Sequence, residues 1–260
     1  MNSSVELELL AFLLPSEDIG VITIILVVFF FAGVIKGFLG IGLPAAAMAI
    51  LTLVIEPTMA ISLLTLPIIF TNSIQYASCK SPRIIAAKYW LFAMAIMSSI
   101  FVTSLFILSF PTAILTISIG FAMITFSLTQ MFGAHMPIGP GRSWHVAVGL
   151  FSGTLGGLSS IWSPPVAMYL VTQNVSKDEF IGATGFLFLA GSIPLATGLA
   201  FAGVLTLTTT LHSLMGLVVV LIGFKFGEWL RGHVPQSIFR QIVLWAFLLM
   251  GGRLIAVGMF

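Results

Sequence analysis

The chain has 260 residues, of which 59% are hydrophobic and only 7% charged, and its mean hydropathy is +1.17. Soluble domains carry about 25% charged residues, so this composition excludes a soluble protein and predicts an all-α polytopic membrane protein. The formal net charge of +2 rests on few groups, and no nucleic-acid partner is expected. The single cysteine, Cys79, excludes an internal disulfide.

Residues 1–18 form a short acidic N-terminus without Lys or Arg. Because it lacks the basic region of a signal peptide, we expect the following apolar run to stay in the protein. A full crossing needs about 20 residues, so the second, sixth and seventh of the predicted apolar segments are too short for a comfortable crossing. The ten segments are 19–39, 42–55, 57–79, 84–109, 111–132, 144–157, 163–174, 178–203, 206–230 and 235–259.

The stretch 33–44 interrupts the first of these apolar regions with four glycines, Lys36 and Pro44. Glycine and proline mark backbone that does not continue as ordinary helix. At membrane depth such backbone persists only where it is buried in protein or lines a polar cavity. A lysine there costs roughly 2.5–3.5 kcal/mol on insertion scales, so Lys36 is a candidate functional residue.

The stretch 149–165 repeats this pattern in the second half of the chain. Its glycines 149, 153 and 156 align with glycines 33, 37 and 40, and Pro44 then matches Pro164 or Pro165. A second match lays 65–74 over 184–193 at a similar offset. We therefore predict two repeats, each with a broken or short helix pair followed by three long transmembrane helices.

Basic residues predict the orientation of these repeats. They cluster at 80–88, at Arg142 and at 225–240, and the positive-inside rule places these regions in the cytoplasm. Both termini then lie outside, and the halves are inverted, as in many secondary transporters. The predicted organisation is an extracytoplasmic N-terminus (1–18), a first repeat (19–132), a cytoplasmic linker (133–143) and a second repeat (144–260), in a bacterial-type inner membrane.

The broken stretches are expected to form an anion site. Helices that begin near Pro44 and Pro164 direct free N–H groups and positive dipole ends at a ligand. Lys36 would add a cation, and hydroxyls from the second stretch would add donors. Asn72 and Gln75 lie three residues apart, on one helix face, and offer amide donors without charge.

Each of these features also has a simpler explanation. Glycines spaced four apart, as at 33 and 37 or at 149 and 153, often serve helix packing. Lys36 could extend toward an interface. Serines in membrane helices often bond to their own backbone, and Asn72 and Gln75 could link two helices.

Catalytic alternatives are weaker. An intramembrane serine enzyme would use Ser152 or Ser160 with His145 or His212, but the chain has no Gly-x-Ser-x-Gly elbow. No pair of His or carboxylates has metal-ligand spacing. We therefore expect no enzymatic activity, no metal and no cofactor.

The ordered motifs resemble one family. Gly-x-x-Lys-Gly-x-x-Gly-x-Gly-x-Pro at 33–44 is followed by Thr-x-Pro-x-x-x-Thr-Asn-x-x-Gln at 65–75 and a second glycine-rich stretch with Ser-Pro-Pro. Over about residues 20–258 the chain is similar to the TauE/SafE family, also grouped as 4-toluene sulfonate uptake permeases. The second stretch departs from the commoner Gly-Gly-Gly form, and its bulky Trp162 leaves the substrate size open.

The resemblance implies a membrane transporter, commonly an exporter, for sulfite, organosulfonates or related sulfur anions. We expect such an anion to bind near the midplane, with the lipid bilayer as the surroundings and a coupling ion (H+ or Na+) and a homodimer left open. A transporter of another small anion, such as a carboxylate, is the alternative. The predicted substrate-binding residues are Lys36, Gly40, Gly42, Pro44, Asn72, Gln75, Gly156, Gly157, Ser159, Ser160, Trp162, Ser163, Pro164 and Thr184.

Overall fold

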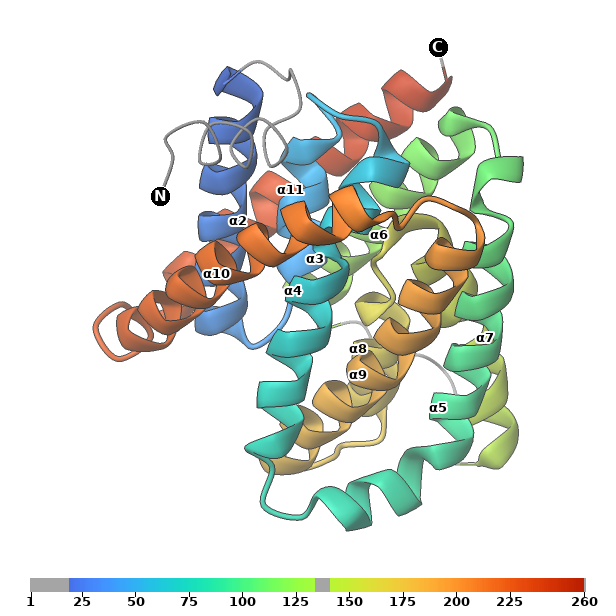
Figure 1. The fold of residues 1–260 in the computed structure, drawn as a ribbon. Coiled ribbons are helices and arrows are strands. Elements are labelled where there is room, and N and C mark those ends of the chain that lie inside the picture. Colours follow the sequence, from blue (N-terminus) through green and yellow to red (C-terminus); the bar gives the residue numbers. More distant parts are fainter. Residues whose placement is uncertain (1–18, 134–140, 260) are drawn as a thin grey trace, which may run out of the picture.

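The computed structural model describes residues 19–133 and 141–259, and the predicted N-terminus and most of the predicted linker lie outside these residues. The described residues form ten α-helices and one short 3-10 turn, without strands, which confirms the all-α prediction (Figure 1). The helices are α2 (Ile19–Leu39), α3 (Leu43–Leu51), α4 (Pro57–Ala77), α5 (Pro82–Leu105), α6 (Thr112–Phe132), α7 (Arg142–Ser159), α8 (Ser163–Thr172), α9 (Lys177–Phe201), α10 (Leu207–Leu230) and α11 (Gln236–Met259), with the 3-10 turn η1 at Ile107–Ser109.

Seven of the described helices are long and apolar enough to cross a membrane, namely α2, α4, α5, α6, α9, α10 and α11. The chain is therefore a multi-pass membrane protein. The helices outside this set are α3, α7 and α8, which correspond to the segments that the sequence predicted to be short. The helix α7 is the longest of the three, with 18 residues.

Glycines let the long helices pack closely. Gly33 and Gly37 of α2 lie against the backbone of α10, where an added Cβ would collide with main-chain carbonyl oxygens. Gly149 and Gly153 of α7 lie in the same way on α5, where a Cβ on Gly153 would come within 2.6 Å of the Ile96 carbonyl oxygen. At all four positions the packing explanation of these glycines is confirmed.

Helices at matching positions in the two halves have matching partners. The helix α2 packs mainly on α10, α7 mainly on α5, and α6 on α11. This exchange of partners is what a duplicated unit would give, since α2 corresponds to α7 and α5 to α10. The inverted relation of the two halves stays a prediction.

The two short helices follow breaks in the chain. After α2 the backbone turns through Gly40 and Gly42, whose φ angles are 82° and 97°, values that only glycine adopts without strain. Helix α7 ends similarly, at Ser160 with a φ of 63°. Helices α3 and α8 then begin with proline in their first two positions, as predicted from Pro44 and Pro164.

One end of the molecule, here called the basic end, carries the loops with Lys80, Arg142 and Arg231. Lys80 donates a hydrogen bond of 2.8 Å to Asp178 at the start of α9, and this bond raises the pKa of Lys80 above its usual range. Because both side chains are largely exposed, the pair adds little to stability. These charges therefore identify one end of the molecule but contribute little to its stability.

Candidate functional site

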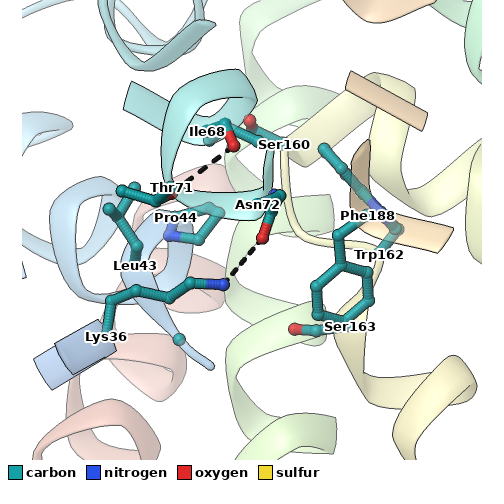
Figure 2. A pocket seen from close by; sticks show the side chains of 11 residues that line it. Lys36, Leu43, Pro44, Ile68, Thr71, Asn72, Ser160, Trp162, Ser163 and Phe188 are labelled. Atoms are coloured by element: carbon teal, nitrogen blue, oxygen red, sulfur yellow. Dashed lines mark hydrogen bonds between the residues drawn. The ribbon is translucent and has the colours of Figure 1, made fainter. Parts of the chain in front are cut away.

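A small cavity lies where the two broken stretches meet the middle of α4 and α9 (Figure 2). Its volume is about 20 Å³, little more than a single water needs. Both halves of the chain contribute, so residues more than 100 positions apart share one wall. The lining residues are Lys36, Gly42, Leu43, Pro44, Ile68, Thr71, Asn72, Ser160, Trp162, Ser163 and Phe188.

Among the residues that the structure describes, Lys36 is the one Lys or Arg that lines this cavity. Its side chain is 3% exposed, and Nζ donates a hydrogen bond of 2.7 Å to Asn72 Oδ1 (Figure 2). Nζ also lies 5.8 Å from the ring centre of Phe188, a cation–π distance. Lys36 therefore points inward, and among the described residues no carboxylate forms an ion pair with it.

Two further donors in the cavity wall have no partner. Ser160 Oγ and Trp162 Nε1 are buried and form no hydrogen bond within the described part of the chain, and the two residues are 0% and 3% exposed. Most buried polar atoms in native proteins are hydrogen-bonded. Two unpaired donors therefore lie in the same cavity wall as a buried lysine that has no carboxylate partner in the described chain.

Other predicted residues of the broken stretches lie just outside the cavity wall. Gly157 faces Thr103 of α5, and Gly156 faces the Trp162 side chain, which a Cβ would approach to 2.7 Å. Ser159 Oγ donates to the Leu155 carbonyl at 2.6 Å and accepts the Ile161 N–H at 3.0 Å. Pro164 is buried in the first turn of α8. These residues shape the bend that presents Ser160 and Trp162.

A second, larger cavity of about 310 Å³, here called the vestibule, reaches toward the basic end. Lys36 lines both cavities, and the vestibule also contains the predicted residues Gly40, Gln75 and Thr184 together with Glu228 and Arg231. Gln75 Nε2 donates to Thr184 Oγ1 at 3.0 Å and to the Ile181 carbonyl at 3.1 Å, so Gln75 links α4 to α9.

Glu228 and Arg231 of the vestibule differ in their partners. Glu228 pairs with Lys225 at 2.8 Å. The Arg231 guanidinium instead donates to the Gly37 carbonyl oxygen, at the end of α2. Arg231 and Gly37 are 194 positions apart, so no local sequence pattern indicates this contact.

Several lining residues carry little signal in the sequence. Leu43, Ile68 and Phe188 are apolar in a chain that is apolar nearly everywhere, so periodicity cannot separate a cavity wall from a lipid-facing surface. Thr71 stands next to Asn72 in the motif at 65–75. Its Oγ1 donates to the Pro67 carbonyl at 2.6 Å, so it contributes its methyl group and shape more than a free donor.

The arrangement offers groups that could bind a ligand. Ser152 Oγ donates to the Trp162 carbonyl at 2.5 Å, while the His145 ring stacks on Phe92 and meets Tyr169 edge-on. No contact between described residues links either serine of the enzyme alternative to His145, and no group of three metal-ligating side chains occurs in the described ranges.

Comparison with known proteins identifies the family. A search of curated proteins and a search of solved structures found no significant match. The family model described as sulfite exporter TauE/SafE matches residues 25–254. These residues include every helix from α3 to α10, both broken stretches and all residues that line the two cavities. The chain therefore belongs to the TauE/SafE family of sulfite exporters.

Proposed function

We propose that the protein exports a small sulfur oxyanion, sulfite in the first place, by binding it in the central cavity against Lys36. The observation that carries this proposal is the buried ammonium of Lys36, whose one hydrogen-bond acceptor in the described chain is the neutral Asn72. Burying a charge without a counter-charge is costly, and an anionic substrate would supply that counter-charge during each cycle.

The neutral groups around Lys36 support an oxyanion with several acceptor atoms. Ser160 Oγ and Trp162 Nε1 are free donors, and Ser163 lines the same wall at the start of α8. Hydrogen bonds to charged groups contribute about 1.5–3 kcal/mol each. A carboxylate has fewer oxygens than a sulfite ion, so it would leave more of these donors unpaired.

The direction of transport follows from the vestibule and the membrane potential. The vestibule opens toward the basic end, which the positive-inside rule places in the cytoplasm. Substrate would therefore reach Lys36 from the cell interior. With a negative interior, each anionic charge that leaves gains about 2.3 kcal/mol per 100 mV, which favours export without a dedicated energy source.

Flux into liposomes tests the proposal. Purified protein is reconstituted, and sulfite, sulfate and acetate movement is measured with and without a Na+ or pH gradient. We expect sulfite flux that Lys36→Met abolishes and that the matched control Lys225→Met, in the exposed ion pair with Glu228, leaves intact. Acetate flux without sulfite flux would favour the carboxylate alternative, and full sulfite flux in Lys36→Met would contradict the proposed site.

A further inference from the structure

The Trp162 side chain is held rigidly at the wall of the central cavity. Its side chain lies against Gly156 and Gly191. A Cβ added at Gly156 would come within 2.7 Å of the Trp162 Cβ and 3.0 Å of its ring, and a Cβ added at Gly191 would come within 3.2 Å of the ring. Its ring meets Phe188 edge-on, at 6.2 Å between centres and 88° between planes. Its carbonyl accepts the Ser152 hydroxyl, so both its backbone and its side chain are fixed.

The two glycines explain why the indole can occupy this place. Gly156 belongs to α7 and Gly191 to α9, and both lack the side chain that would fill the same volume. The aromatic wall therefore rests directly on the backbone of two helices. Close-packed interiors of this kind resist displacement, and an edge-to-face aromatic pair adds about 0.5–1.5 kcal/mol to the packing.

The remaining space is small. About 20 Å³ is left between this wall, Lys36 and Asn72, whereas the vestibule on the other side of Lys36 has about 310 Å³. Sulfite is larger than the single water that this space holds, but it needs less room than an alkanesulfonate. A sulfonate must also place a carbon chain, and on the side of α8 and α9 that chain would meet the indole and the Phe188 ring.

Building on the proposed function, we propose that Trp162, seated on Gly156 and Gly191 and backed by Phe188, sets the upper size of the substrate. The wall selects sulfite over organosulfonates, and the length of the excluded chain is set by the indole. The free Nε1 donor gives the same side chain a second task, because it can bind an oxygen of the small anion that fits. Trp162 is thus a specificity-determining residue.

Two substitutions separate the tasks of wall and donor. Trp162→Ala removes both, and Trp162→Phe keeps most of the wall while deleting the N–H. The ligands are sulfite and the series methane-, ethane- and propanesulfonate, and binding to purified protein is measured by calorimetry together with counterflow in liposomes. The matched control is Trp90→Ala, which removes the same atoms from a side chain that is 56% exposed on α5.

The wild type should bind sulfite at least tenfold more tightly than ethane- and propanesulfonate, and in counterflow it should carry only sulfite. Trp162→Ala should gain at least tenfold in affinity for the longer sulfonates relative to sulfite. Trp162→Phe should stay selective while losing roughly tenfold or more in sulfite affinity, because one donor to a charged ligand is gone. Trp90→Ala should match the wild type.

Failure of the inference and failure of the proposed function give different results. If the wild type binds sulfite but Trp162→Ala rejects long sulfonates as strongly, the wall does not set the size. Wild-type binding of propanesulfonate as tight as that of sulfite would overturn the inference as well. Absence of sulfite binding in the wild type overturns the proposed function itself. If Trp162→Ala does not fold, Phe188→Ala opens the same wall from α9 and must widen selectivity in the same direction.

Discussion

At the residue scale, the contact between Lys36 and Asn72 gives the lysine a hydrogen-bond partner that carries no charge. Asn72 Oδ1 holds the ammonium at 2.7 Å without neutralising it, so the cation stays available to a ligand. A carboxylate at the same place would satisfy Lys36 permanently. Under the proposed function, an amide at this position would leave the charge of Lys36 for the substrate to compensate.

We expect Asn72→Asp to abolish sulfite binding, because the new carboxylate would form a buried ion pair with Lys36 and repel the anion. Calorimetry on purified protein measures the loss, which should exceed 100-fold in affinity, on the order of the 3 kcal/mol that a buried charge partner contributes. The control Gln75→Glu places a charge on the same helix face but in the vestibule, and should have a smaller effect. Unchanged affinity in Asn72→Asp would contradict the role of Lys36.

Gly42 is the second residue whose conformation serves the site. Its φ of 97° precedes the first turn of α3, so a side chain there strains the backbone even though the nearest side-chain atom is 3.6 Å away. We expect Gly42→Ala to cost about 1–2 kcal/mol and to weaken sulfite binding. The control Gly252→Ala, in open space on α11, should stabilise the protein by about 0.5–1 kcal/mol. Thermal unfolding in detergent distinguishes the two, and equal melting temperatures would refute the argument.

At the element scale, a serine of α10 forms hydrogen bonds with backbone groups of α4 near the proline inside that helix. Pro67 lies inside α4 and lacks the N–H that would bond to the Leu63 carbonyl. Ser213 of α10 donates to that carbonyl at 2.8 Å and accepts the Leu66 N–H at 3.1 Å. In a membrane such freed backbone groups must find partners within the protein.

We therefore expect Ser213→Ala to lower the free energy of unfolding by about 1–3 kcal/mol, because it leaves buried backbone groups unpaired. The control is Ser98→Ala, since Ser98 is exposed and bonds only to the Ala95 carbonyl of its own helix. Denaturation in mixed micelles measures both variants. Equal stabilities would show that water or a backbone shift replaces the serine.

The sequence predicted the helices better than the cavity walls. Segments 57–79 and 206–230 correspond to α4 and α10 within two residues at each end, because apolar length and flanking proline or polar residues fix where a helix can begin and end. For α5 the predicted segment ran on through the 3-10 turn, since hydropathy does not distinguish the two helix types. The contact of Ser213 with α4 depends on tertiary packing, which no local pattern encodes.

The candidate site was predictable only where its residues stand out from an apolar background. Lys36 and Asn72 are polar in apolar segments, so their types alone singled them out, and the structure joins them by a hydrogen bond. Gly157 was equally conspicuous but faces Thr103, since a glycine can serve a ligand or a helix contact. Phe188 could not be found, because its type is the same on a cavity wall as on a lipid-facing surface.

At the scale of the whole molecule, the basic end and the vestibule coincide. Loops with Lys80, Arg142 and Arg231 lie at this end, and the vestibule opens beside Arg231. The vestibule is lined by two cationic side chains, Lys36 and Arg231, and by one carboxylate, Glu228, which pairs with Lys225. A cleft with an excess of positive charge attracts anions, so the vestibule would also gather the proposed substrate.

We expect both termini to face away from the cytoplasm. A C-terminal alkaline phosphatase fusion should be active in cells, and a C-terminal green fluorescent protein fusion should be dark. Fusions that end in the 80–83 loop serve as the control and should show the opposite pattern. An inactive phosphatase fusion together with a fluorescent green fluorescent protein fusion would show that the C-terminus lies in the cytoplasm. The vestibule would then open to the opposite side of the membrane.

Lys36 faces two compartments of very different size, and this arrangement has a pharmacological consequence. A sulfonate too long for the central cavity can still enter the vestibule and neutralise Lys36 from there, which would block the carrier without being carried. Propanesulfonate should then inhibit sulfite flux when it is added on the side of the basic end, with relief by excess sulfite, and have no effect from the opposite side. Equal inhibition from both sides in oriented liposomes would exclude this mechanism. Inhibition from one side only would make propanesulfonate a probe for the face of the transporter on which the vestibule opens.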